Sequence, residues 1–216
     1  MTISPLSAGL GSSADLLERL RCVDLPTLGH LLEEGFVSSA VRQLGQRRRM
    51  VGTAVTLALD APDATAVNRA LVELNPGEVL VVDMGGNHTH APIGAVTVAA
   101  ARARGAAGIV VDGVVTDVEA LRDAHSGLPV YARGTSCLTT KRLDGRRERR
   151  QVPVHIGGVR VTPGDFVLGD ANGVIALPAS SLAVVVHQAE LSDAAEPELL
   201  RRIRAGEDLR TLLHVD

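Results

Sequence analysis

The sequence contains almost no aromatic residues. Trp is absent, Tyr occurs once and Phe twice, so aromatic residues make up 1% of the chain although hydrophobic residues make up 45%. The core must therefore be built from Val, Leu, Ile and Ala, which suits packed strands and helices. With 216 residues, the chain is long enough to bury a sizeable core, and we expect a single domain over residues 1–216 without a linker.

Three further absences narrow the class of protein. The only two cysteines, Cys22 and Cys137, lie far apart and form no disulfide or metal-binding pattern. No basic stretch followed by an apolar run opens the chain, and no segment approaches the roughly 18 consecutive apolar residues of a membrane span. The formal net charge of −3 gives no general attraction to nucleic acid. We therefore expect a cytoplasmic protein with neither a membrane nor a nucleic-acid partner.

The middle of the chain alternates between strand and helix patterns. Residues 78–84, 107–113 and 128–134 read as strands, and the first two are apolar enough to be buried on both faces. Residues 91–105 and 116–127 read as helices. This alternation predicts a parallel βαβαβ unit within a mixed α/β fold.

The flanking segments follow other patterns. Ahead of the alternating section we expect helices over 12–23 (capped by Ser12 or Ser13), 25–36 and 63–74, and a strand over 47–59. Residues 152–178 hold short strands separated by Gly-Gly, Pro-Gly-Asp and Asn-Gly, which favour antiparallel hairpins. Residues 141–151 read as a solvated basic loop, and the tail from Ser180 as a helical region that Pro197 interrupts.

A glycine-rich loop follows the strand at 78–84. Ligands of open α/β sheets collect beyond the carboxyl ends of the strands. Gly94 lies near the start of the next helix, where free N–H groups of Gly94, Ala95, Val96 and Thr97 could face an anion. From the residues alone, a helix start with a glycine is more often plain structure than a site.

Two acids follow the strand at 107–113. Asp112 comes directly after its apolar run, and Asp117 falls in the first turn of the next predicted helix. Acids are favoured there by the helix dipole, and Asp112 could equally be a turn residue. The pattern therefore leaves structural and functional roles open for both.

The glycine loop also carries His88 and His90. A His-x-His pair on an extended segment can place both imidazoles on one side and bind a transition metal, but it can also be a solvated loop. The sequence has no Walker loop, no Gly-x-Ser-x-Gly elbow, no Cys–His dyad and no dinucleotide fingerprint.

Four stretches together resemble one family. These are "VDGVVTDVEAL", "LPVYARGTS", "VPVHIGGVRVTPGDFVLGDANGVIALP" and "RRIRAGEDL". The chain resembles the RraA-like family over roughly residues 13–210; the family includes 4-hydroxy-4-methyl-2-oxoglutarate aldolase and the regulator of ribonuclease activity A. The resemblance implies a swivelling β/β/α-type α/β fold with a parallel βαβ core and C-terminal hairpins and helices. It also implies a homotrimer, or a hexamer of two trimers, with sites near subunit interfaces.

The resemblance also assigns roles within the aldolases. A divalent metal, usually Mg²⁺ with Mn²⁺ as an alternative, is held directly by one aspartate, which matches Asp117, and otherwise through water. Sparse protein ligation of this kind suits Mg²⁺. The small-molecule substrate, a 2-oxo acid, is bound by the metal and by backbone amides that match Gly94, Ala95, Val96 and Thr97.

One position departs from the aldolase pattern. The residue before the metal aspartate is an arginine in the aldolases, where it contacts the bound oxo acid, but here it is Thr116. Losing a charged donor at a developing oxyanion costs on the order of 10²–10³ in rate. Substitute cations in the sequence are His88, His90, Arg122, Arg133 and Lys141. Of these, Arg133 is predicted to bind the substrate.

Three hypotheses follow. The first is a divergent metal-dependent lyase acting on a 2-oxo acid or a similar chelating carboxylate, with Thr116, His88 and His90 as catalytic residues. The second is a non-catalytic regulatory protein of the ribonuclease-regulator type. The third is a transition-metal site made by His88, His90 and Asp117 together.

Overall fold

The computed structural model describes residues 12–123, 127–144, 146 and 148–215. The chain divides into two compact units, one formed by residues 1–32 with 180–216 and the other by residues 33–179. The expectation of a single domain over 1–216 stays a prediction.

The first unit is helical. Its helices are α1 (Ser13–Leu20), α2 (Leu25–Gly29), α6 (Ala179–Arg204) and α7 (Leu209–Leu212). Ser12 caps α1, as predicted, by accepting a hydrogen bond from the Asp15 N–H, while the Asp15 carboxylate accepts one from the Ser12 N–H. The guanidinium of Arg19 donates two hydrogen bonds to the carboxylate of Glu190 on α6 and lowers the pKa of that carboxyl group.

Three predictions about helix length are wrong. The helix expected over 116–127 begins at Val118 and ends at Arg122, and residues 124–126 of that prediction lie outside the described residues. The helix expected over 25–36 ends at Gly29. The end of the expected segment is extended instead, because Phe36 forms an antiparallel bridge with Ile175. Helix α6 continues through Pro197, which was expected to interrupt it. A proline removes one backbone hydrogen bond from a helix. The hydrogen-bonded turns before and after Pro197 keep α6 continuous.

The second unit is built on one large sheet. Its strands are β1 (Arg42–Gln43), β2 (Met50–Leu59), β3 (Glu78–Asp83), β4 (Gly108–Val115), β5 (Val130–Thr135), β6 (Glu148–Arg150), β9 (Phe166–Gly169) and β10 (Val174–Leu177). Among the described residues the order is β1-β5-β4-β3-β2-β9-β10, and β6 also pairs with β2. Strands β2, β3, β4 and β5 are parallel, so the predicted parallel βαβαβ unit is confirmed.

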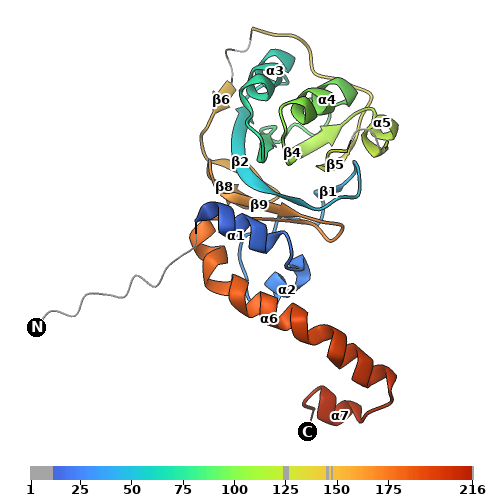
Figure 1. Cartoon of the computed structure of the whole chain (residues 1–216). Helices are drawn as coiled ribbons and strands as arrows, with labels where there is room; N and C mark the ends of the chain where they lie inside the picture. The colour runs from blue at the N-terminus through green and yellow to red at the C-terminus, as the bar shows by residue number, and fades with distance from the viewer. Residues whose placement is uncertain (1–11, 124–126, 145, 147, 216) are drawn as a thin grey trace, which may run out of the picture. The chain divides into compact units, whose positions relative to one another are not determined.

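Helices cover one face of this sheet and a hairpin covers the other. The helices are α3 (Ala64–Glu73), α4 (Ala95–Ala103) and α5 (Val118–Arg122), which lie on one side of the sheet in Figure 1. On β3, Leu80 and Val82 pack with buried residues of these helices. Val79 and Val81 point the other way, into a cluster shared with the hairpin of β7 (Val154–Ile156) and β8 (Val159–Val161). Strand β3 is therefore buried on both faces, as predicted.

The segment after β5 combines one confirmed and one wrong prediction. The antiparallel hairpins expected over 152–178 are present as β7–β8 and β9–β10. The predicted basic loop over 141–151, however, contains β6, which pairs antiparallel with residues 57–59 of β2. Arg150 of β6 pairs with Glu73 and Glu148, so part of this basic segment is held to the sheet instead of being free in solvent.

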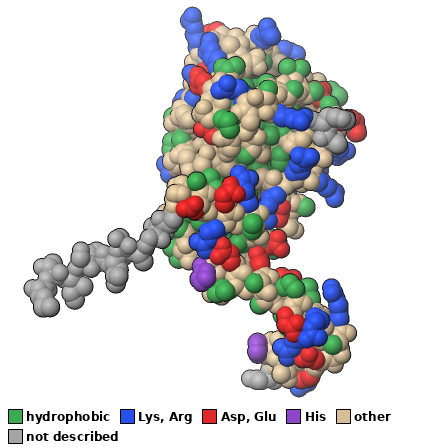
Figure 2. Space-filling model, in the orientation of Figure 1, with side chains coloured by type: hydrophobic (Ala, Val, Ile, Leu, Met, Phe, Trp, Pro, Cys, Tyr) green, Lys and Arg blue, Asp and Glu red, His purple; other side chains and the backbone are tan. Residues whose placement is uncertain are grey.

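Two broader features concern the helices and the surface of the molecule. None of the described helices has both the length and the apolarity needed to cross a bilayer. On the face drawn in Figure 2, Lys and Arg side chains occur in several separate places.

Candidate functional site

The ends of strands β3 and β4 bring two loops together on the helix side of the sheet. Thr116 directly follows β4, and its N–H donates a hydrogen bond of 2.9 Å to the carbonyl oxygen of Ile93. Gly94, the next residue, is the N-cap of α4. The chain after β4 therefore runs alongside the first turn of α4, and Asp117 lies next to that turn.

Asp117 turns its carboxylate toward α4. Its backbone lies in the left-handed region, with φ 55° and ψ 38°, and its side chain makes no capping bond to its own helix α5. Instead its Oδ2 accepts a hydrogen bond of 2.9 Å from the N–H of Ala95. The left-handed conformation costs about 1–2 kcal/mol for an ordinary residue, and Asp and Asn tolerate it best. This backbone conformation directs the exposed carboxylate across to the neighbouring helix.

Gly94 leaves the space that this carboxylate occupies. A Cβ atom at Gly94 would lie 2.5 Å from Asp117 Oδ2 and 2.7 Å from Thr116 Cγ2. Both separations are shorter than real Cβ contacts, so any side chain at this position would displace Asp117 or Thr116. The backbone conformation does not require a glycine here, since any residue can adopt its φ of −148°. The close approach between the two loops does require it.

The four backbone N–H groups predicted to face an anion, those of residues 94–97, divide into two pairs. The Gly94 N–H donates to Thr97 Oγ1 at 2.7 Å, and the Ala95 N–H donates to Asp117. No hydrogen bond from the N–H of Val96 or Thr97 is found among the described residues. These two groups in the first turn of α4 are therefore the ones open to an external acceptor.

The side chain of Thr97 has a role that the sequence analysis missed. Its hydroxyl accepts from the Gly94 N–H and donates to the Gly94 carbonyl oxygen, both at 2.7 Å. The signal was present in the sequence, because a polar side chain at the third position of a helix often bonds back to the N-cap backbone. Thr97 thus fixes Gly94, and with it the start of the helix.

The donor set at Asp117 fits a hydrated divalent cation. A carboxylate offers about four acceptor positions, and two are used here, by Ala95 and by a weak bond of 3.3 Å from Thr116 Oγ1. Asp117 is exposed, and no ion pair joins it to another described residue. A hard oxygen ligand with open positions and room for water is what Mg²⁺ uses when few protein groups bind it.

The histidine loop is ordered by its asparagine. Asn87 Oδ1 accepts from the backbone N–H groups of Thr89 at 3.1 Å and His90 at 2.9 Å, and His90 Nδ1 lies 3.0 Å from Thr89 Oγ1. His88 is exposed. No described hydrogen bond joins either histidine to Thr116 or Asp117, so the catalytic roles assigned to His88 and His90 stay predictions.

A site with three protein ligands for a transition metal is not seen. Within the described ranges, no three His, Cys, Asp or Glu side chains gather closely enough to hold an ion together. His88, His90 and Asp117 therefore do not form such a cluster in this structure. A site with a single carboxylate and several waters has no need of one.

The other candidate cations are engaged elsewhere or stand apart. Arg133 forms an ion pair with Asp112 and, two residues after Tyr131 on β5, lies on the hairpin side of the sheet. Arg122 lies 3.6 Å from Glu119 on its own helix. Lys141 is exposed and forms no ion pair with a described residue. No hydrogen bond between described residues joins any of the three side chains to Thr116, and substrate binding by Arg133 stays a prediction.

Comparisons with known proteins agree with this architecture. A model of the RraA-like family, described as Aldolase/RraA, matches residues 15–176. The chain is 36% identical, over 152 residues, to a 4-hydroxy-4-methyl-2-oxoglutarate aldolase of Thermus thermophilus, an alignment that covers 70% of this chain and 90% of that protein.

Two solved structures share the fold. One, from Pseudomonas syringae pv. tomato, has a TM-score of 0.79 and 24% identity, and the match covers 98% of this chain and all of that one (100%). The other is Streptomyces coelicolor RraAS2, described as an unusual member of the RNase ES inhibitor RraA protein family. It has a TM-score of 0.72 and 29% identity, with 88% of this chain and 96% of that chain covered. The predicted α/β fold class is confirmed.

Proposed function

The chain belongs to the RraA-like family, and on that premise we propose that it is a divergent lyase that depends on a divalent metal. Its substrate is a 2-oxo acid or a similarly chelating carboxylate, and its metal is Mg²⁺, with Mn²⁺ as the alternative. The relative in Thermus thermophilus that is named as an aldolase supports the reaction class. Thr116, which stands where the aldolase pattern has an arginine, supports a substrate specificity that differs from that of the aldolases.

The observation that carries the proposal is the 2.9 Å hydrogen bond from the Ala95 N–H to Asp117 Oδ2. It holds an exposed carboxylate, which no described cation neutralises, beside the open N–H groups of Val96 and Thr97. An acceptor for a cation and two donors for an anion therefore lie next to each other. This combination of groups matches the charge and the acceptor oxygens of a chelating carboxylate substrate.

Each residue then has a definite task. Asp117 would hold the cation through its open acceptor positions, and the cation, when bound, would polarise the oxo and carboxylate oxygens of the substrate. The N–H groups of Val96 and Thr97 would bind and orient the substrate carboxylate at the positive end of the α4 dipole. Thr97 Oγ1 and Gly94 keep that turn in place.

Thr116 limits the reaction. Its hydroxyl can donate one hydrogen bond to a developing oxyanion, whereas a guanidinium would add a fixed positive charge and several donors. Among the described residues, no hydrogen bond joins Arg122, Arg133 or Lys141 to this position. The proposed enzyme is therefore a slow aldolase on the family's usual substrates, or a faster enzyme on a substrate that develops less charge beside Thr116.

The substitution Thr116→Arg tests this proposal. We expect it to raise Mg²⁺-dependent pyruvate release from 4-hydroxy-4-methyl-2-oxoglutarate, and decarboxylation of oxaloacetate, by about 10–100-fold over wild type, because it restores a charged donor. Thr116→Val is the matched control and should not exceed wild type. If neither wild type nor Thr116→Arg shows a Mg²⁺-dependent rate on either substrate, the lyase proposal fails.

A regulatory protein without catalysis is the second candidate. It is supported by the likeness to a protein described as belonging to the RNase ES inhibitor family, and by the missing charge at Thr116. This reading predicts inhibition of a ribonuclease of that type in an RNA-cleavage assay, equally by wild type and by Asp117→Asn. A complete absence of inhibition by both proteins would reject it.

A further inference from the structure

We propose that the groove between helices α4 and α5 binds the distal chain of the substrate, and that this substrate is a 2-oxo acid with a long apolar chain ending in a carboxylate. The inference rests on the proposed function, and it adds the substrate class. The groove has a volume of about 610 Å³ and is lined by Ala95, Val98, Ala99, Arg102, Ala103, Ala120, Leu121 and Asp123.

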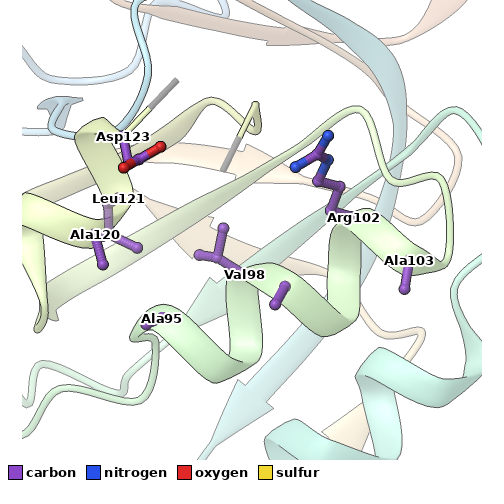
Figure 3. A pocket seen from close by; sticks show the side chains of 8 residues that line it. Ala95, Val98, Arg102, Ala103, Ala120, Leu121 and Asp123 are labelled. Carbon is purple, nitrogen blue, oxygen red and sulfur yellow. The ribbon is translucent and has the colours of Figure 1, made fainter. Parts of the chain in front are cut away.

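The groove adjoins the candidate site at Ala95. Ala95, which lines it, is also the residue whose N–H binds Asp117. Figure 3 shows Ala95 at the first turn of α4, with Val98 and Arg102 following along the same helix and Ala120 and Leu121 facing them from α5. A ligand anchored at the start of α4 therefore has an adjoining channel along the helix into which the rest of its chain can extend.

The walls of the groove are apolar over most of its length. Apart from Arg102 and Asp123, every lining residue is Ala, Val or Leu. The small side chains of Ala99, Ala103 and Ala120 keep the channel wide. Burying apolar ligand surface against these side chains favours binding through the hydrophobic effect, and the side chains offer no hydrogen bonds to a polar chain. They therefore favour methylene groups over hydroxyl or amide groups.

The length of the groove sets the length of the chain. Ala95 and Arg102 lie seven positions apart on α4, which corresponds to roughly 10 Å at about 1.5 Å per residue. An extended carbon chain advances roughly 1.2 Å per bond, so about eight bonds span this distance. A 2-oxo diacid of the size of 2-oxosuberate fits it, whereas pyruvate would fill only the first part.

Arg102 supplies the charge at the far end. Its side chain is exposed, and no ion pair or hydrogen bond of its guanidinium is found within the described part of the chain. A guanidinium matches a carboxylate with two donors in one plane. Asp123 lines the opposite wall, on the α5 side. The positive end of α4 and Arg102 thus present two anion-binding positions at the two ends of an apolar channel.

Isothermal titration in excess Mg²⁺ tests the proposal with three probes: pyruvate, 2-oxooctanoate and 2-oxosuberate. We expect wild type to bind 2-oxosuberate at least tenfold more tightly than pyruvate. Ala99→Phe, which fills the groove, should remove this gain and leave pyruvate binding unchanged. Arg102→Gln should weaken 2-oxosuberate binding by about tenfold and change 2-oxooctanoate binding by less than twofold.

Two matched variants serve as controls, because neither residue lines the groove. Arg122→Gln removes a charge from α5, and Ala171→Phe adds an exposed ring in the β9–β10 turn. Both should leave all three affinities as in wild type. Sedimentation velocity on Ala99→Phe is measured in parallel, since a second copy of the chain is the other occupant that such a groove could take.

The possible failures can be told apart. If no 2-oxo acid binds with Mg²⁺, the proposed function and this inference are both overturned. If pyruvate binds but 2-oxosuberate binds no more tightly, only the groove assignment is overturned. If Ala99→Phe changes the sedimentation coefficient while 2-oxosuberate binding stays intact, the groove is an interface between subunits and the assignment is again overturned.

Discussion

Asp112 and Asp117 belong to the same strand end, yet they have opposite surroundings. Asp112 faces the hairpin side, where its carboxylate pairs with Arg133 and accepts a hydrogen bond of 3.0 Å from the Gly157 N–H. Asp117 faces the helix side and, among the described backbone groups, accepts a hydrogen bond from Ala95 alone. One carboxylate is satisfied by the protein, and the other keeps acceptor positions for a ligand. The number of hydrogen bonds and ion pairs that each carboxylate makes with the protein, more than its position in the strand, separates the structural Asp112 from the candidate functional Asp117.

Asp83 repeats the structural pattern on the neighbouring strand. It lies in register with Asp112, and its carboxylate accepts from the N–H groups of Gly85 at 2.8 Å and His155 at 3.1 Å. The two acids therefore hold the β7–β8 hairpin over the ends of β3 and β4. The hairpin side is closed by these bonds, and the helix side is where an open site remains.

Removing the charge at Asp112 should have the largest effect on stability. We expect Asp112→Asn to lower the free energy of unfolding by about 2–3 kcal/mol, because it leaves the half-buried Arg133 without its partner. The measurement is urea unfolding followed by circular dichroism. Asp117→Asn, which breaks no ion pair, should change the unfolding free energy by less than about 1 kcal/mol. Equal losses for the two variants would mean that the contrast between the two acids is not real.

A side chain at Gly94 should damage the open site without unfolding the protein. The Cβ of Gly94→Ala would meet Asp117 Oδ2 and Thr116 Cγ2, so we expect Mn²⁺ binding to weaken by about tenfold or more, a loss of roughly 1.4 kcal/mol. Gly134→Ala is the matched control, because its Cβ would find its nearest neighbour, Val114 Cγ1, at 3.9 Å. Unchanged Mn²⁺ affinity in Gly94→Ala would show that the close approach has no bearing on the site.

The smallest effect is expected from Thr97. Thr97→Val keeps the shape of the side chain and removes the hydroxyl that bonds both backbone groups of Gly94, so the unfolding free energy should fall by about 1 kcal/mol. Thr97→Ser retains the hydroxyl and should restore most of that stability. A Ser variant as unstable as the Val variant would point to packing of the methyl group instead of the hydrogen bonds.

The sequence predicted the parallel core well because local patterns determine it. Buried strands β3 and β4 consist of continuous apolar runs, and the alternation with helices leaves few ways to arrange them. The placement of Asp117 near the start of α4 could also be anticipated, because the ends of adjacent parallel strands meet at one edge of a sheet.

Other features depended on contacts between distant residues. Asp112 is structural because Arg133 and Gly157 bind it. The carboxylate of Asp117 is oriented by the N–H of Ala95. These partners are distant in sequence, so no local pattern contains them. The left-handed backbone of Asp117 shortens α5 at its start and redirects the side chain, whereas the sequence suggested an ordinary first turn. Strand β6 was missed because its basic residues resemble a loop until their partners on β2 and α3 are known.

The most direct test of the account is Mn²⁺ binding, followed by electron paramagnetic resonance, to wild type, Asp117→Asn and Asp112→Asn under conditions where all three are folded. Asn tolerates the left-handed backbone as Asp does, so the first variant changes the charge and little else. We predict that Asp117→Asn binds Mn²⁺ at least tenfold more weakly than wild type and that Asp112→Asn binds it as wild type does. Equal affinity in wild type and Asp117→Asn would contradict the claim that this carboxylate holds the cation.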